Sequence, residues 1–239
     1  SSSQEPELVD AAPWGIKERL VFEKTAVGFY LSGHLFDEVA LEIRRFARRP
    51  IDDLIDTREP QLMAGIVTDF RVINGQRGKL GLFKLDDKSA VIEARADEAM
   101  ITTYRHLLKD DELVIVMGKQ QPDRFSGGMQ LTITHIWDLE QARCRFGKFL
   151  RVAVTTGGAD KAPDVARLLK DFPAQKEVTE EGDKVHGMPV RLAVNCQSPK
   201  GAASTELQLG EQARFYPSDA ALAAWRLQAI NGKSEIVYE

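Results

Sequence analysis

The stretch QLMAGIVTDFRVINGQRGKLGLFKLDDKSAVIEARA, which covers residues 61–96, decides the fold of this chain. Apolar residues alternate with residues of mixed polarity over residues 62–72, and this period of two predicts a β-strand. The turn-rich sequence Asn-Gly-Gln-Arg-Gly at residues 74–78 leads into a second strand over residues 80–85. An aspartate-rich turn then precedes a third strand over residues 91–94. The stretch therefore predicts three consecutive strands joined by tight turns.

The residues that follow extend this pattern to a five-stranded unit. The apolar positions of residues 97–108 recur with a helical period, and a fourth strand is expected over residues 113–117. A loop that contains Phe-Ser-Gly-Gly at residues 125–128 separates it from a fifth strand around residues 131–135. Three strands, a helix and two more strands within residues 61–142 is the order of an OB-fold, a small Greek-key barrel that often binds nucleic acid or sugar.

The segment before the barrel, residues 14–60, is expected to be helical. Apolar positions recur with a helical period over residues 16–31, and Ser-Gly at residues 32–33 is suited to end that helix. Asp37 is suited to cap a second helix, which is expected to end before the proline at position 50. Residues 1–13 are polar and acidic without any period, which predicts a disordered leader.

The last segment, residues 143–239, predicts a small α/β (α+β) C-terminal domain. A strand is followed by a helix over residues 165–172 and by a long exposed loop over residues 174–187. A meander of three strands, a helix capped by Ser218 and a terminal strand over residues 236–238 complete it. The predicted fold class is thus mixed α and β: a helical leader, a five-stranded OB-fold barrel and this C-terminal domain.

Charge and composition exclude several classes of protein. Lys and Arg number 32 and Asp and Glu number 36, and the resulting formal charge of −4 argues against a protein that holds duplex DNA by bulk charge. Arginine clusters at residues 44–49 and 143–151 are expected on solvated faces or at helix ends. No stretch approaches the roughly 20 apolar residues of a membrane-spanning helix. Cys144 and Cys196 lack zinc-site spacing, and neither they nor the N-terminal sequence indicates secretion, so a cytoplasmic location is expected.

The predicted barrel carries side chains suited to a single-stranded nucleic acid, which requires cations for its phosphates and flat groups for its bases. Phe83 is expected in the core, since it alternates with Leu82 along its strand. The candidate nucleic-acid-binding residues are Arg71, Arg77, Lys79, Lys84, Arg124 and Phe125. The alternative is that Phe125 packs over the barrel end and that the cations are ordinary surface.

Other chemistry receives less support from the residue pattern. A metal site could be imagined from Asp69, Asp86, Asp87 and Asp123, but tight-turn hydrogen bonding explains the aspartate pair more simply. The four histidines lack ligand or triad spacing, and the Gly-Gly at residues 157–158 is not followed by a phosphate-loop signature. No catalytic residue, metal or cofactor is therefore expected.

The last helix offers a candidate surface for a partner protein. Leu222 and Trp225 are expected mainly in its core-facing side, although an exposed part of that face, together with Tyr238, could dock a partner.

Several motifs, in order along the chain, resemble the C-terminal region of the catalytic alpha subunit of bacterial DNA polymerase III. These are Arg-Gly-Lys at residues 77–79, Leu-Asp-Asp at 85–87, Phe-Ser-Gly-Gly at 125–128, the helical segment at 18–34 and Asp-Leu-Glu-Gln-Ala-Arg at 138–143. The resemblance runs from about residue 14 to the end and weakens after residue 145. The ordered set is far more specific than any one motif.

This resemblance implies that the OB-fold contacts single-stranded template DNA and that the last segment docks the tau subunit of the clamp loader. Two positions depart from the family pattern: Leu35-Phe36 replaces a common Pro-Leu, and Leu82 replaces an exposed aromatic residue that would stack on a base. The polymerase palm is not within these residues, and the sliding clamp is expected to bind upstream residues only. The chain is thus expected to be a non-catalytic part of a DNA-directed DNA polymerase, a nucleotidyltransferase, that works in the bacterial replisome.

Two other readings stay open. One is a protein-interaction fragment that binds no nucleic acid, which a flat salt response would favour. The other is a free-standing OB module of the tRNA anticodon-binding kind, which a preference for RNA would indicate.

Overall fold

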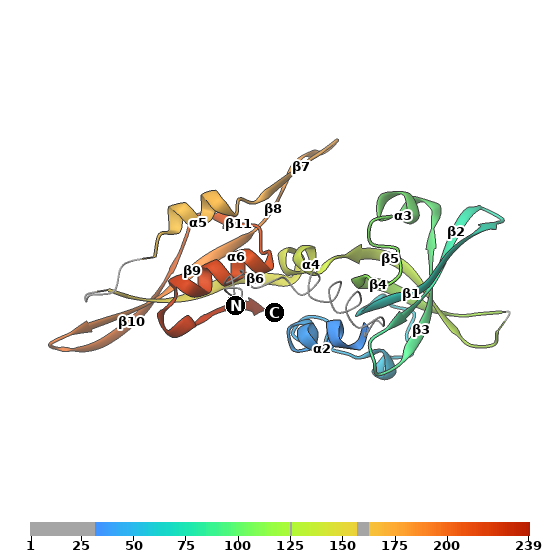
Figure 1. Cartoon of the computed structure of the whole chain (residues 1–239), viewed down its shortest axis with the longest axis horizontal. Helices are drawn as coiled ribbons and strands as arrows, with labels where there is room; N and C mark the ends of the chain where they lie inside the picture. The colour runs from blue at the N-terminus through green and yellow to red at the C-terminus, as the bar shows by residue number, and fades with distance from the viewer. Residues whose placement is uncertain (1–31, 125, 157–162) are drawn as a thin grey trace, which may run out of the picture.

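The computed structural model describes residues 32–124, 126–156 and 163–239. Figure 1 shows an elongated molecule with a barrel at one end and a second sheet, accompanied by helices, at the other. Helix α4 (Leu139–Phe146) leads from the last barrel strand into the first strand of the second sheet. The boundary expected after residue 142 therefore falls inside this helix. No helix in these three described ranges has the length and apolar character needed to cross a membrane.

The barrel is closed and has the connectivity of an OB-fold, which confirms the predicted fold class. Its strands follow each other in space as β1-β2-β3-β5-β4, and β4 pairs again with β1. All pairs are antiparallel except β3 with β5. The strands are β1 (Gln61–Gly75), β2 (Gly78–Asp86), β3 (Val91–Asp97), β4 (Leu113–Pro122) and β5 (Met129–Trp137).

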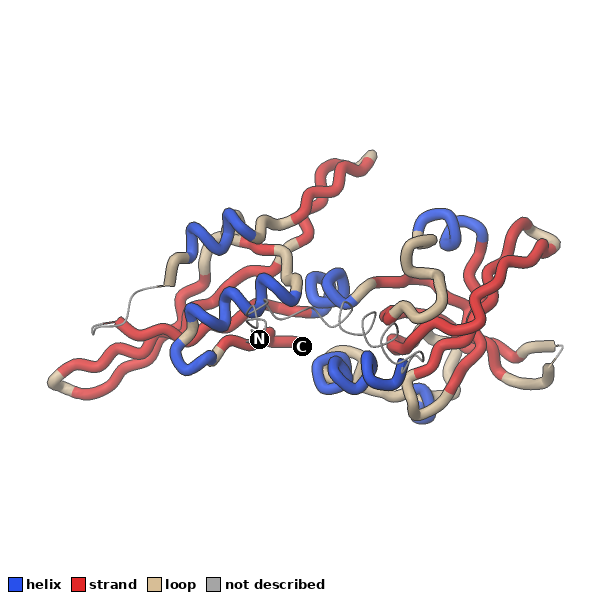
Figure 2. The backbone as a smooth tube through the Cα atoms, in the orientation of Figure 1, coloured by secondary structure: helices blue, strands red, loops and turns tan. Residues whose placement is uncertain are grey.

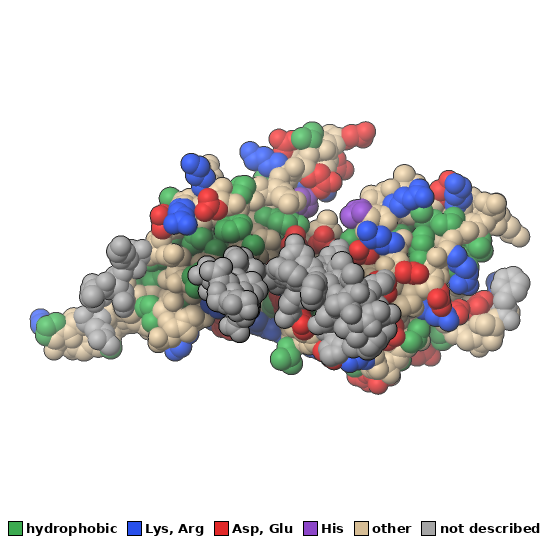
Figure 3. Space-filling view, in the orientation of Figure 1, with side chains coloured by type: hydrophobic (Ala, Val, Ile, Leu, Met, Phe, Trp, Pro, Cys, Tyr) green, Lys and Arg blue, Asp and Glu red, His purple; other side chains and the backbone are tan. Residues whose placement is uncertain are grey.

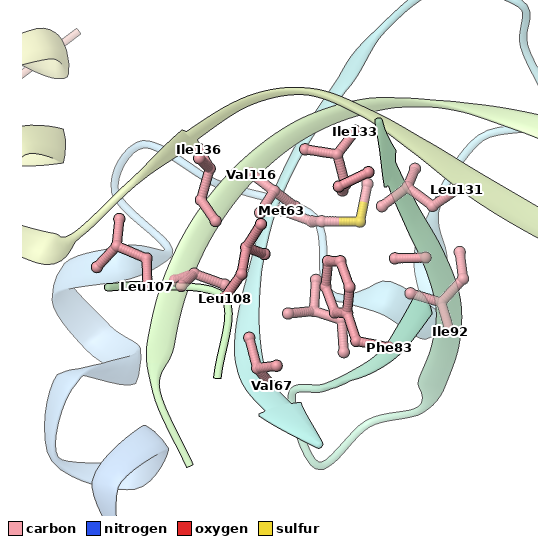
Figure 4. Close-up of a cluster of buried hydrophobic side chains, with 14 of the residues drawn as sticks. Met63, Val67, Phe83, Ile92, Leu107, Leu108, Val116, Leu131, Ile133 and Ile136 are labelled. Atoms are coloured by element: carbon pink, nitrogen blue, oxygen red, sulfur yellow. The ribbon is translucent and has the colours of Figure 1, made fainter. Parts of the chain in front are cut away.

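Successive side chains of a strand point to opposite faces, and the apolar side chains on the inner face fill the barrel interior, as Figure 4 shows. Phe83 is 2% exposed and lies near Met63, which confirms that Phe83 rather than Leu82 faces the core. Helix α3 (Glu98–Thr103) is capped by Asp97, whose side chain accepts a hydrogen bond from Met100 N at 2.8 Å. The helix is shorter than the predicted range of 97–108. The chain turns after it, and Leu107 and Leu108 still pack into the core.

Helix α2 (Ser32–Ile43) covers the outside of the barrel where β1 meets β4. Phe36, Val39 and Ile43 recur at helical spacing and are buried. They pack in one cluster with Ala64 and Ile115, so these strands are buried on both faces at this point. Ser32, Gly33 and Asp37 all lie within α2, so the expected helix stop at residues 32–33 and the expected cap at Asp37 are wrong, because burial of one helix face against the barrel outweighs these local signals. The residues predicted to form the disordered leader and the first helix, 1–31, lie outside the described ranges.

The second sheet has the strand order β10-β9-β6-β12, with the short β11 (Arg214–Phe215) paired to β9. Strands β6 and β9 are parallel, and helices α5 and α6 bury Leu168, Trp225 and Phe215 in a cluster against the sheet. The predicted meander is thus corrected, because β11 returns to β9 rather than to β10. Ser218 caps α6 as predicted and accepts a hydrogen bond from Ala221 N. The elements are β6 (Gly147–Thr156), α5 (Val165–Asp171), β9 (Met188–Ser198), β10 (Gly201–Gln208), α6 (Asp219–Gln228) and β12 (Ser234–Tyr238), with 3-10 turns η1 (Ile51–Asp53) and η2 (Ile230–Gly232).

The stretch predicted to be a long loop, residues 174–187, is a β-hairpin. Strands β7 (Gln175–Thr179) and β8 (Gly182–His186) pair only with each other, and Figure 2 shows them projecting from the second sheet. Their side chains are charged or polar on both faces, apart from exposed Val178 and Val185, so no apolar alternation signals the strands.

Candidate nucleic-acid interface

A row of outward-facing side chains crosses the barrel perpendicular to its strands. Register pairs Arg71 with Leu82, Leu82 with Arg95, Arg95 with Thr132, and Thr132 with Lys119. Paired residues project on the same side of a sheet, and their neighbours along the strands, such as Phe83 and Ala94, fill the core. We call the row Arg71, Leu82, Arg95, Thr132 and Lys119 the outer cationic row. It places three cations and one half-exposed leucine on the outer surface of the barrel.

The neighbouring row is close to neutral. Lys84 pairs with Glu93 across the strands, and its Nζ lies 3.4 Å from Asp69 Oδ2. Arg95 Nη1 donates a hydrogen bond to Gln130 Oε1 at 3.3 Å, which holds this guanidinium along the barrel surface. Of the predicted cations, Lys84 thus has an acidic partner. Within the described ranges, Arg71, Arg77 and Lys79 have no salt-bridge partner.

The β1–β2 hairpin carries two of the predicted cations. Gly75 pairs with Gly78, so Gln76 and Arg77 form a two-residue turn, and Gly78 has a positive φ of 114°. Arg77 and Lys79 are exposed, and Val72 and Ile73 are 45% and 42% exposed beside them. The hairpin therefore offers aliphatic surface together with positive charge.

The β4–β5 loop is organised by Asp123. Its Oδ2 accepts a hydrogen bond from Ser126 Oγ at 2.8 Å, and its backbone N–H donates to Gly128 O at 2.8 Å. Arg124 is exposed in this loop, and Phe125 lies outside the described ranges. Figure 1 shows the loop and the β1–β2 hairpin at the end of the barrel away from the second sheet. These are two of the loops that flank the binding face of OB-folds.

Sequence reasoning missed Arg95, Lys119 and Thr132. Arg95 alternates with Ala94 and Ala96, which are buried, and this alternation in the sequence is enough to predict that Arg95 faces outward. Its place beside Arg71 depends on cross-strand register, which the sequence does not reveal. Figure 3 shows Lys and Arg side chains interspersed with Asp and Glu on the visible face of the barrel.

Two of the predicted docking residues are buried. Trp225 is 0% exposed and Tyr238 is 9% exposed, whereas Leu222 is partly buried. Trp225 thus lies in the core, as expected for most of that helix face, and Tyr238 is buried as well, so neither side chain is exposed to a partner in this structure. Tyr238 instead donates a hydrogen bond from its hydroxyl to Glu42 Oε1 at 3.0 Å.

The aspartates considered for a metal site serve separate structural roles. Asp69 pairs with Lys84, Asp123 organises its loop, and Asp87 accepts hydrogen bonds from Ile51 N and Ser89 Oγ. In the part of the chain that the structure describes, no three His, Cys, Asp or Glu residues gather in a way that could hold a metal ion.

Three groups with shifted pKa values, Arg143, Cys144 and Tyr216, lie on or beside α4, away from the outer cationic row. Burial raises the pKa of the Cys144 thiol to about 12, and the charges of Asp138 and Glu140 add to this effect. Burial and the same two carboxylates raise the pKa of Tyr216 as well. Burial alone would lower the pKa of Arg143, but its hydrogen bonds and charge pairing with Glu42 and Asp219 raise it. The Cys144 thiol is consequently protonated at neutral pH, which makes it a poor nucleophile.

The closed five-stranded barrel, its strand order and its exposed loops place the chain among the OB-fold proteins. Comparison with curated sequences then shows a specific family. The chain belongs to the family of the DNA polymerase III alpha subunit and matches its C-terminal region, as the sequence motifs predicted.

The relatives are all longer than the chain. It is 37% identical over 214 residues to DNA polymerase III subunit alpha of Pseudomonas fluorescens and 41% identical over 214 residues to that of Pseudomonas aeruginosa, with 89% of the chain and 17% of each relative covered. Identity with the subunit of Escherichia coli strain K12 is 28% over 246 residues, covering 99% of the chain and 20% of the relative. The chain thus spans about a fifth of the length of these relatives.

The chain has only distant structural relatives among the solved structures named below. No family model matches the chain. The second single-stranded DNA-binding protein of Mycobacterium smegmatis is 15% identical, with a TM-score of 0.32, and the match covers 37% of this chain and 94% of that one. The second OB-fold domain of replication protein A from Methanococcus maripaludis is 16% identical, with a TM-score of 0.30, and covers 38% and 96%.

Proposed function

We propose that this chain is a non-catalytic C-terminal part of a DNA polymerase III alpha subunit and that its barrel binds single-stranded DNA. The observation that carries this proposal is the outer cationic row, in which cross-strand register places Arg71, Arg95 and Lys119 in one line on the outer surface of the barrel. Polymerisation, a nucleotidyl transfer, is assigned to the remaining parts of the subunit.

The arrangement suits a flexible strand better than a duplex. Three cations in one row across the barrel strands, with Arg77, Lys79 and Arg124 on the flanking loops, match a strand whose phosphates follow the protein surface, whereas the overall charge of −4 does not attract a duplex. Leu82, Val72 and Ile73 offer apolar surface for bases, and Phe125 is proposed to supply the stacking group, which contributes about 1 to 3 kcal/mol per base. Lys84 is proposed as a weaker contributor, because Asp69 neutralises it.

Fluorescence anisotropy with a labelled single-stranded DNA oligonucleotide at several salt concentrations tests this proposal. The variant Arg71→Gln/Arg95→Gln is expected to weaken binding at low salt and to lower the slope of log K against log salt by about 1.4, since each lost phosphate contact removes about 0.7. Arg167→Gln/Lys170→Gln on exposed α5 is the matched control and is expected to leave both quantities unchanged.

The competitors in the same assay separate the alternatives. Stronger competition by single-stranded RNA than by DNA would favour the anticodon-binding type of module. Equal affinity of the barrel variant and the unaltered chain, or a flat salt response, would contradict DNA binding by this face.

A second proposed function is docking of the clamp-loader tau subunit by the second sheet. Membership of the family motivates it, and the second sheet supports it with a free edge strand and a projecting hairpin. The proposed location is the bacterial cytoplasm, at the replisome, and contact with the sliding clamp is assigned to residues outside this chain.

A further inference from the structure

Strand β10 is an unprotected edge of the second sheet. It stands at the end of the strand order, and all eight of its residues are exposed. Its pairing with β9 runs without a register shift from Gly201 to Gln208, so one long side of the strand leaves its alternate N–H and C=O groups without sheet partners.

Edge strands in natural proteins are usually short, bulged, covered or rich in lysine and proline. Strand β10, with the sequence GAASTELQ, has no lysine, arginine or proline. The opposite edge, β12, has five residues with an irregular register at Val237, and β7 and β8 carry Lys176 and Lys184. In the described part of the chain, β10 is thus the long edge without these protective features.

The side chains of β10 differ between its two faces. On the helix-covered face, Thr205 pairs with Val194, a member of the core cluster, and Leu207 pairs with Leu192, which packs against that cluster. Leu207 is nevertheless 53% exposed. On the other face, Glu206 lies 3.0 Å from Arg151 and 3.8 Å from Arg191, so its charge is already paired. An added strand would therefore need apolar side chains on the Leu207 face and polar side chains on the other.

We infer that β10 is a docking edge that receives an extended strand of a partner protein, with apolar and polar residues in alternation. Main-chain hydrogen bonds would supply affinity, and the apolar residue beside Leu207 would supply selectivity. The inference deepens the proposed docking of tau and rests on it, because it specifies where and how the second sheet would hold that partner.

The test measures binding of purified tau subunit by biolayer interferometry to the unaltered chain and to Ser204→Pro and Thr205→Pro. Successive residues of a strand direct their N–H groups to opposite edges, so one of these prolines removes a donor from the free edge and the other weakens pairing with β9. A proline that removes a free-edge donor leaves the pairing with β9 intact, so this variant should keep the thermal unfolding midpoint of the unaltered chain. We call it the free-edge variant. We expect it to bind tau at least about tenfold more weakly. Asp56→Pro, at an exposed position outside the second sheet and its hairpin, is the control and should bind as the unaltered chain does.

Hydrogen–deuterium exchange gives a second readout that does not depend on folding of a variant. Binding of tau should slow exchange of alternate β10 amides in the unaltered chain. Suppose that the unaltered chain binds tau, that both proline variants bind it with the same affinity, and that tau does not slow exchange of the β10 amides. The inference that β10 is the docking edge is then wrong, while the proposal that the chain docks tau stands. If the unaltered chain does not bind tau, both proposals fall. A third outcome is that, without tau, the β10 amides become protected as the chain self-associates with rising concentration in sedimentation experiments. The strand that pairs with β10 would then come from a second copy of this chain, and the inference would be overturned.

Discussion

Asp87 shows how one side chain joins the segment before the barrel to the barrel itself. It is 3% exposed, and its carboxylate accepts hydrogen bonds from Ile51 N at 2.8 Å, Ser89 Oγ at 2.6 Å and Arg44 Nη2 at 3.0 Å. Burial alone would raise the pKa of Asp87, but these bonds, with another from Ala90 N, hold it below the ordinary value of 3.8. Asp87 was expected only to hydrogen-bond within a tight turn. In the structure it also fixes the start of η1 and the residues that follow α2.

Asp87→Asn is expected to lower the free energy of unfolding by about 2 kcal/mol at pH 7, because hydrogen bonds to a buried charged group are lost. The folded-state pKa is depressed, so the stabilisation is complete above pH 3.8 and disappears as the pH falls through the folded value. Urea unfolding should show a difference between variant and parent that is largest at pH 7 and shrinks below pH 3.8. Asp56→Asn, at an exposed position, is the control. A difference that grows in acid would contradict the argument.

At the scale of the element, the β1–β2 hairpin depends on a backbone conformation that only glycine adopts readily. Gly78 has a φ of 114°, and a Cβ there would lie 2.5 Å from Glu98 Oε2, which already accepts a hydrogen bond from Lys79 N. The conformation of Gly78 therefore sets where Arg77 and Lys79 are presented.

Gly78→Ala is expected to destabilise the chain by about 1 to 2 kcal/mol because of strain at positive φ. It should also weaken binding of single-stranded DNA at low salt, since Arg77 and Lys79 would be displaced. Gly210→Ala is the matched control, because a Cβ at that position meets nothing within 4 Å. Thermal unfolding and anisotropy of both variants check the two effects, and equal stability of the two alanine variants would exclude the strain.

At the scale of the whole molecule, a buried ionic network connects the barrel side to the second sheet. Arg143, 4% exposed on α4, pairs with Glu42 of α2 at 2.8 Å and with Asp219 of α6 at 2.9 Å. Tyr238 of β12 donates to the same Glu42, and Phe46 stacks on Phe146 with ring centroids 5.5 Å apart. Helices α2, α4 and α6 and strand β12 meet at this point, which couples the two units.

Arg143→Met is expected to lower the free energy of unfolding by about 3 to 5 kcal/mol, because it leaves a partly buried Glu42 without its cation. Calorimetry should then resolve separate transitions for the two units, whereas a single transition is expected for the parent. The double variant Glu42→Met/Arg143→Met should lose less than the sum of the two single variants, since the removed charges are partners. Arg145→Met, exposed on the same helix, is the control. Strict additivity would show that the pair is not coupled.

The barrel could be predicted from the sequence, because period-two alternation and turn residues in 61–96 are local properties of neighbouring side chains. The Ser218 cap could be predicted as well, since a cap depends only on the first turn of its helix. Local patterns led to two wrong predictions. Strands β7 and β8 were predicted to be a loop, because their hairpin has no buried face to impose alternation, and residues 32–33 were predicted to end a helix but lie within α2.

Which distant residues meet could not be predicted from the sequence and depends on the packing of the folded chain. Arg143 lies in a cluster that sequence reasoning assigned to a solvated face or helix end, and it is buried because Glu42 and Asp219 arrive from segments 101 and 76 residues away. Arg71, Arg95 and Lys119 form one row because strand register aligns them across the barrel. Trp225 is enclosed because α6 packs against the second sheet. Such contacts between segments distant in the chain leave no periodic trace along it, since they arise from the closure of the barrel and the packing of helices on a sheet.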